Sequence, residues 1–146
     1  HEIAEIFNLD KASATNGCTL AVNTLHNIER SEVPSNHSNL CITLPSSFVE
    51  RYCSKLNISV DLTKLCKFIA KKVEHNNMIT DNIPHAITAG IICFVAYNCS
   101  LEINKQDIKI VSGVSEVTIN KCFKKLETIK EQLLPSAIIK KYNIII

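Results

Sequence analysis

The chain has 146 residues, enough for one domain or a little more, and 46% of them are hydrophobic, which is ample for a buried core. The net charge of +2 is too small to indicate a nucleic-acid binder from overall composition alone. The longest apolar run, at residues 86–97, is shorter than the roughly 20 residues that span a bilayer, so we expect a soluble intracellular protein with no membrane partner.

Two helices joined by a turn are predicted for the first 30 residues. Residues 1–7 are already amphipathic, residues 8–10 form the turn, and a second helix runs over residues 11–29. Gly17 costs this helix about 1 kcal/mol relative to Ala, which indicates that another element packs closely there. Because no helix start signal precedes His1, we expect a piece of a longer protein. Helical spacing predicts the buried face of the second helix: Ala14, Cys18, Ala21, Leu25 and Ile28.

A linker is predicted at residues 31–44, where Ser, Asn and Pro34 occur without periodicity. Two amphipathic helices should follow, at residues 45–56 and 60–76. The second of these has an apolar stripe formed by Leu62, Leu65, Cys66, Ile69 and Val73. Its opposite face is basic and carries Lys64, Lys67, Lys71 and Lys72.

The helix that ends at Asn98 is predicted to be the central one of the fold. Asp81 or Asn82 would cap its start, and Pro84 would lie in its first turn, where proline is tolerated. The helix is apolar nearly all round, which is typical of a helix that is covered on every side. Gly90 should mark the place where a neighbouring helix approaches most closely.

Residues 105–126 have the pattern of a helix-turn-helix. Gly113 suits the sharp turn because glycine adopts positive φ at little steric cost. Ser115 would cap the second helix, and Glu116 in its first turn would complement the helix dipole. Four apolar residues stand where such a unit packs together: Ile108, Val114, Ile119 and Cys122.

The outward face of the second helix in this unit has the composition of a recognition helix. Such a helix enters the major groove, where base edges are readable and phosphates flank them. From residue 104 onwards, eight Lys outnumber four acidic residues, which favours a polyanionic partner. The alternative is an ordinary helical hairpin with solvated lysines, and the pattern alone leaves both open. The face consists of Val117, Asn120, Lys121, Lys124 and Lys125.

The cysteines and histidines do not form a recognisable metal or catalytic pattern. Seven Cys occur without a CxxC pair, and an odd count fits a reducing compartment. His37 and Cys41 are the one close His–Cys pair, and a tetrahedral zinc site would need a second pair. The five His are scattered. We therefore predict no metal site, no cofactor and no enzymatic activity for this chain.

An internal repeat is visible when the start of the chain is shifted by 105 residues. Residues 1–30 would then end an earlier copy of a unit that is complete at residues 45–135. The tail at residues 136–146 ends in three Ile, which either pack on the body or await a partner. The shift places Ile3 on Ile108, Ile6 on Val111, Leu9 on Val114, Ala14 on Ile119, Cys18 on Phe123 and Ala21 on Leu126.

Four segments match one known family in its own order. They are FVERYCSKLNI at 48–58, LTKLCKFIAKKVE at 62–74, IPHAITAGIICFVA at 83–96 and IKIVSGVSEVTINKCFKKL at 108–126. The run GVSEVTI at 113–119 is close to the signature that precedes this family's recognition helix. In these segments the chain resembles the second cyclin-like repeat of the transcription factor IIB family, including its archaeal relatives.

The resemblance implies an all-α fold with a five-helix cyclin-like repeat, complete at 45–135 with a helix-turn-helix at 105–126. The last helices of a first repeat would lie at 1–30, before the linker at 31–44. It also implies a general transcription initiation factor that binds the TATA-binding protein–promoter DNA complex and helps recruit RNA polymerase. Zinc would be expected only in an N-terminal ribbon before His1. The implied location is the nucleus, or a cytoplasmic viral factory or virion if the source is a large DNA virus.

The family's recognition helix reads a promoter element upstream of the TATA box with a Val and, one turn on, an Arg. Val117 matches the Val, whereas Asn120 stands at the Arg position. Because Asn pairs best with adenine, the resemblance implies an altered or weakened base preference. Thr118 is a further candidate DNA-binding residue. Three lysines fit phosphate contacts, which position the protein without reading sequence: Lys105, Lys121 and Lys124.

Two related functions stay open at this point. A polymerase III factor related to transcription factor IIB shares the same repeats, and a C-terminal extension beyond Ile146 would favour it. A cyclin proper shares the fold and regulates a kinase through protein binding. Lys121 and Lys124 argue against a cyclin, since cyclins lack a basic helix-turn-helix surface at this position.

Overall fold

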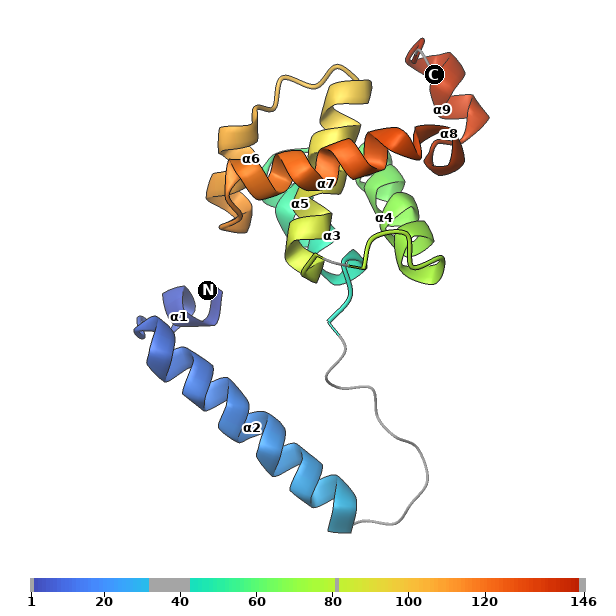
Figure 1. Ribbon diagram of the computed structural model, residues 1–146. Helices are drawn as coiled ribbons and strands as arrows, with labels where there is room; N and C mark the ends of the chain where they lie inside the picture. Colours follow the sequence, from blue (N-terminus) through green and yellow to red (C-terminus); the bar gives the residue numbers. More distant parts are fainter. Residues whose placement is uncertain (1, 32–42, 81, 145–146) are drawn as a thin grey trace. The chain divides into compact units, whose positions relative to one another are not determined.

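The computed structural model describes residues 2–31, 43–80 and 82–144, and every regular element among them is a helix (Figure 1). The chain divides into two compact units, residues 1–42 and residues 43–146. The division falls within the predicted linker at 31–44, most of which lies outside the described residues. Each unit has its own architecture.

The first unit consists of α1 (Glu2–Ile6) and α2 (Lys11–Ser31), which confirms the two predicted helices. Asn8 takes a positive φ of 50° in the turn between them. The Asp10 carboxylate accepts hydrogen bonds from the backbone N–H groups of Ala12 at 2.9 Å and Ser13 at 3.0 Å. Together with the Ser13 hydroxyl, which is the largest contribution, these bonds lower the pKa of Asp10. Asp10 therefore supplies the start signal of α2.

The prediction of a buried face on α2 is mostly wrong within the first unit. Ala14 is buried, but Cys18 and Ala21 are exposed, and Leu25 and Ile28 are each about half exposed. The physical reason is that, among the described residues of this unit, α2 packs only on α1, which has five residues and cannot cover a helix of 21 residues.

The close approach predicted at Gly17 is also wrong. A Cβ added at this position would meet no atom within 4 Å. Gly17 lies well inside α2, and none of the described residues requires the small side chain there.

The second unit begins with the five predicted helices: α3 (Ser46–Lys55), α4 (Val60–His75), α5 (Pro84–Asn98), α6 (Lys105–Ser112) and α7 (Glu116–Thr128). α5 packs against each of the other four, and in Figure 1 the orange-red α7 crosses the yellow α5. Two short helices follow, α8 (Lys130–Leu133) and α9 (Ser136–Lys141). α8 has no counterpart among the predicted elements.

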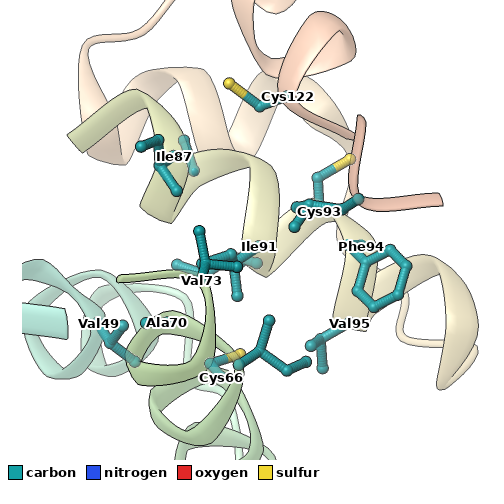
Figure 2. Close-up of a cluster of buried hydrophobic side chains, with 14 of the residues drawn as sticks. Val49, Cys66, Ala70, Val73, Ile87, Ile91, Cys93, Phe94, Val95 and Cys122 are labelled. Atoms are coloured by element: carbon teal, nitrogen blue, oxygen red, sulfur yellow. The ribbon is translucent and has the colours of Figure 1, made fainter. Parts of the chain in front are cut away.

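The core of the second unit is built around α5, as predicted. Every residue from Ala86 to Ala96 is buried, including the large side chains of Ile91 and Phe94. Figure 2 shows side chains from α3, α4 and α7 gathered around this helix. Burying such a side chain contributes roughly 1.5–3 kcal/mol each, so α5 is the element that holds its neighbours in place.

Gly90 lies where α5 and α7 approach closely, which confirms the predicted close approach. A Cβ added at Gly90 would lie 2.4 Å from the Cβ of Cys122 and 3.4 Å from the Cys122 backbone. Real Cβ atoms do not approach so closely, so only glycine allows the two helices to cross at this separation.

The predicted cap of α5 is wrong. The residue at the N-cap position is Ile83, and it makes no side-chain cap. Asp81 lies outside the described residues, and the Asn82 side chain instead accepts a hydrogen bond from Lys125 of α7. Pro84 does lie in the first turn, as predicted. The Asn82 side chain is thus used for a tertiary contact, which a local capping pattern cannot show.

The tail packs on the body of the second unit. The side chains of Ile138, Ile139, Tyr142 and Ile144 are partly buried against the core. The final two Ile lie outside the described residues. Of the two alternatives for the tail, the structure supports packing on the body for the residues that it describes.

Candidate nucleic-acid interface

A capping box begins the first helix of the helix-turn-helix. The Asn104 side chain accepts from the Asp107 backbone N–H at 2.8 Å, and the Asp107 carboxylate accepts from the Asn104 N–H at 3.1 Å. Gly113 caps the C-terminal end of α6, where φ is 68° and the N–H donates to the Lys109 carbonyl at 2.8 Å. The predicted glycine turn is confirmed, and it redirects the chain within three residues.

Two residues hold the turn itself. Val114 is buried and fills the space between the helices, as predicted. Ser112, which the sequence pattern did not single out, donates its hydroxyl to the Ile108 carbonyl at 2.6 Å and accepts from the Val114 N–H at 3.2 Å. The conformation of the turn is therefore held by side-chain contacts as well as by Gly113.

Ser115 caps α7, as predicted, and Glu116 stands in the first turn. The Ser115 hydroxyl oxygen accepts from the Thr118 backbone N–H at 3.3 Å and lies 2.9 Å from the Thr118 hydroxyl. Thr118 is a candidate DNA-binding residue, and the structure shows that its hydroxyl is already engaged in the cap. Any contact with DNA would have to share it.

The packing of α7 determines which side chains it presents outward. Ile119, Cys122 and Leu126 are fully buried against α5. Since successive residues on a helix are about 100° apart, positions spaced i, i+3, i+4 and i+7 form one stripe on the opposite side. The stripe consists of Val117, Asn120, Lys121 and Lys124, which we call the α7 stripe. Val117 is 65% exposed, both lysines are exposed, and Asn120 is half-buried at the edge.

Two further lysines near α7 lie outside the α7 stripe. Lys105 stands at the start of α6, and its ammonium is 5.9 Å from the centroid of the Phe123 ring, on the flank of α7 nearest Asn120. Lys125 donates to the Asn82 side chain at 2.9 Å, on the other flank. Lys125 was predicted on the outward face, but in the structure its ammonium ties α7 to the loop before α5.

A buried polar contact that sequence reasoning missed holds the end of α7. The Asn98 side chain, which is 8% exposed, donates to the Phe94 carbonyl at 2.9 Å and to the Glu127 carboxylate at 2.8 Å. Lys130 lies 3.7 Å from the same carboxylate. The available signal was a single Asn at the end of an apolar helix, because a buried amide needs hydrogen-bond partners.

The charges around the α7 stripe leave it basic. Lys109 of α6 lies 3.6 Å from the Glu116 carboxylate, so the negative charge at the start of α7 is paired. Both partners are about half exposed, and such a pair contributes little to stability. Lys121 and Lys124 form no ion pair with the residues that the structure describes. Their ammonium groups are available to phosphates.

The described part of the chain offers little support for a metal site, a ligand pocket or a membrane-spanning segment. No group of three or more His, Cys, Asp or Glu there could hold a metal ion. A shallow depression of about 640 Å³ beside Tyr97 and Lys105 includes the Cys93 thiol, whose pKa is raised by burial. None of the described helices is long and apolar enough to cross a membrane. The α7 stripe is therefore the best-defined candidate site.

A family model and several known proteins match this chain. The family model "Transcription factor TFIIB repeat" matches residues 39–129. The chain is similar to a transcription initiation factor IIB-like protein of Acanthamoeba polyphaga mimivirus, with 28% identity over 125 residues, which are 86% of this chain and 27% of that protein. It is also similar to transcription initiation factor IIB of Encephalitozoon cuniculi, with 32% identity over 100 residues, which cover 67% of this chain and 32% of the relative.

A third relative is transcription initiation factor IIB of Dictyostelium discoideum, with 32% identity over 98 residues, which cover 67% of this chain and 30% of the relative. The matched region thus spans no more than 32% of the length of these proteins. The family match extends over all of α3 to α7, and it confirms the predicted all-α, cyclin-like fold class. On this evidence, the chain belongs to the transcription factor IIB family.

Proposed function

We propose that this chain is the core part of a general transcription initiation factor, which binds the complex of TATA-binding protein and promoter DNA and helps recruit RNA polymerase. The observation that carries the proposal is the α7 stripe, an exposed face on a rigid helix directly after the Gly113 turn. Two of the similar proteins are transcription initiation factors IIB, which supports the same role.

In this proposal α7 lies in the major groove of DNA upstream of the TATA box. Val117 offers an apolar surface that suits the methyl group of thymine, and Asn120 offers the amide that pairs with adenine. Lys121 and Lys124 contact phosphates that flank the groove, and these contacts set the position of α7 along the duplex. Because the inner face of α7 is fully buried, the helix backbone is already ordered before binding, and only the outward side chains lose freedom when they contact DNA.

Thr118 and Lys105 have secondary roles in the same proposal. Thr118 stands in the first turn of α7, where its hydroxyl could serve the cap and a phosphate together. Lys105 reaches past Phe123 on the Asn120 flank, so it would contact the DNA backbone beside the groove rather than within it.

We further propose that residues 1–30 end a first cyclin-like repeat, that 31–44 is the linker, that 45–135 is the second repeat with its helix-turn-helix at 105–126, and that 136–146 is a tail. The start of α2 at Lys11 and the start of α7 at Glu116 support this, since they are 105 residues apart. The side chains that cap them, Asp10 and Ser115, have the same separation. The apolar residues that α2 exposes would then be covered by other helices of the first repeat.

The proposed location follows from the proposed role. A transcription initiation factor would act in the nucleus, or in a cytoplasmic viral factory or virion if the source is a large DNA virus. No residue of the chain is assigned a catalytic role.

The proposal is tested on the ternary complex of this chain, TATA-binding protein and promoter DNA, by fluorescence anisotropy across a range of salt concentrations. Lys121→Ala and Lys124→Ala should each weaken binding to all promoter sequences and lower the salt slope by about 0.9. Lys140→Ala, an exposed lysine on α9, is the matched control and should leave the slope unchanged. If both stripe variants bind like the parent while the complex still forms, the α7 stripe is a solvated face.

A further inference from the structure

A second basic surface lies on α4, a helix that the proposed DNA-reading site does not use. Its inner side is fixed by burial against α3 and α5, through Leu62, Leu65, Cys66, Ile69, Ala70 and Val73. Because that stripe is buried, the opposite side of the helix must face solvent. The solvent side carries Lys64, Lys67, Phe68, Lys71 and Lys72, which we call the α4 face.

The lysines of the α4 face differ in their surroundings. Lys67 is paired with Glu50 of α3. The Lys72 ammonium lies 5.6 Å from the centroid of the Phe68 ring. Lys64 and Lys71 are exposed and form no ion pair or hydrogen bond with the residues that the structure describes.

Of the two acidic residues of α4, one is turned away from this face and the other lies at its start. Glu74 is turned towards the start of α3, where its carboxylate accepts from the Ser46 backbone N–H at 2.5 Å and from the Ser46 hydroxyl at 3.2 Å. Asp61 stands in the first turn of the helix, one turn before Lys64. The middle and the end of the α4 face therefore carry a net positive charge on a rigid support.

We propose that the α4 face binds the phosphate backbone of duplex DNA without reading its sequence. Lys64 and Lys71 are seven residues apart, which is about 10.5 Å along a helix, so the two ammonium groups can reach separate phosphates. The α4 face has neither Arg nor Asn, the residues that read guanine and adenine edges best. The α4 face therefore suits phosphate contacts, which position the protein on DNA and strengthen binding, and not base contacts, which read the sequence.

A duplex fits the α4 face better than an acidic protein segment does. Acidic segments that bind tightly also anchor an apolar side chain in a pocket of the partner. Phe68 is the apolar residue here, and Lys72 lies over its ring. Two surface depressions in the described part of the chain, of about 640 and 310 Å³, are lined by residues of α3, α5, α6, α7 and the loops after α3 and before α6, and neither is lined by α4. Phosphates need only the cations.

This inference does not rest on the proposed role of α7. α4 packs on α3 and α5, whereas α7 packs on α5, α6 and α8, so the two basic faces belong to different sides of the helical unit. Binding at the α4 face would add a sequence-independent component to the affinity for any duplex. Binding at the α7 stripe would add the promoter-dependent component.

The test uses the whole chain and a duplex of random sequence, with binding followed by anisotropy between about 50 and 200 mM salt. The Lys64→Gln/Lys71→Gln variant should lower the salt slope by about 1.8, which corresponds to two lost phosphate contacts. The control Lys140→Gln/Lys141→Gln removes the same charge from α9 and should leave the slope unchanged. The Lys64→Arg/Lys71→Arg variant keeps both positive charges and should have the same salt slope as the parent.

Three outcomes would overturn the inference. The first is a Lys64→Gln/Lys71→Gln variant with the slope of the control. The second is a variant that loses binding to polyglutamate while its binding to DNA is unaffected, which would make the α4 face a site for an acidic protein. The third is a variant that binds duplex RNA more weakly than the parent but binds duplex DNA as the parent does. Thermal melting verifies that the variants are folded, which the exposure of both lysines favours. If Lys121→Ala and Lys124→Ala have no effect on the promoter complex while the α4 variant lowers the slope, only the proposed function fails.

Discussion

Adding one methyl group at Gly90 should separate the two helices that hold the candidate interface together. In Gly90→Ala the new Cβ would lie 2.4 Å from the Cβ of Cys122. Carbon atoms in contact are normally about 3.5–4.0 Å apart, so α5 and α7 must move apart by more than about 1 Å at their crossing. Both clashing atoms are Cβ atoms, which the backbone holds in place, so no side-chain rotation can relieve the clash.

The expected loss of stability follows from two opposing effects. Overpacking a core costs about 1–3 kcal/mol, and a clash between two Cβ atoms on rigid helices belongs at the upper end. Replacing Gly by Ala in a helix returns about 1 kcal/mol. The net destabilisation of Gly90→Ala should be about 2 kcal/mol, and Gly90→Leu should cost more. For a unit of this size, a loss of about 2 kcal/mol corresponds to a Tm decrease of about 10 °C.

The assay is chemical and thermal unfolding of the whole chain, followed by circular dichroism. Gly17→Ala is the matched control, since a Cβ there meets no atom within 4 Å and should only gain helix propensity. Gly90→Ala/Cys122→Gly removes the clash from the other side and should recover part of the loss. If Gly90→Ala melts at or above the temperature of the parent, the close crossing of α5 and α7 is refuted.

Three other predictions concern single residues of the second unit and one exposed thiol. Asn120→Arg should favour guanine at one upstream position by about 1–3 kcal/mol, measured by gel shift with that base varied; unchanged preference would remove Asn120 from the base-reading set. Glu127→Ala should cost about 1–3 kcal/mol in denaturant unfolding because it leaves the buried Asn98 amide short of a partner, whereas Glu127→Gln keeps the acceptor oxygen and should cost less. In a Cys41→Ser variant, Cys18 should be alkylated first under native conditions, and the buried cysteines only on unfolding, as read by mass spectrometry. Rapid alkylation of the buried thiols would show that the core opens readily.

The helix-turn-helix could be predicted almost completely because its signals are local. Gly113 at the turn and Ser115 at the cap each act on backbone groups within a few residues along the chain. The apolar residues of α7 recur with the helical period, so its inner and outer faces could be told apart without a structure. For the same reason the predicted members of the α7 stripe do share one face.

Prediction was less successful where a residue has a choice of partners. Asn82 has the side chain of a helix cap, yet it accepts from Lys125, which lies 43 residues away in the sequence. The helical pattern of α2 indicates an apolar face, but burial of that face depends on another element being present, and within its own unit only α1 packs there. Periodicity shows which side of a helix is apolar and does not show what covers it.

The sequence by itself determined the helices of the second unit, the glycine turn and the composition of the outward face of α7, because capping, turn conformation and helical period are properties of neighbouring residues. Only the tertiary structure decided that Gly90 meets Cys122, that Asn98 binds Glu127 and that Lys125 is drawn away from the α7 stripe. These contacts join residues about 30 or more positions apart. Their existence depends on how the helices pack around α5, which no local pattern records.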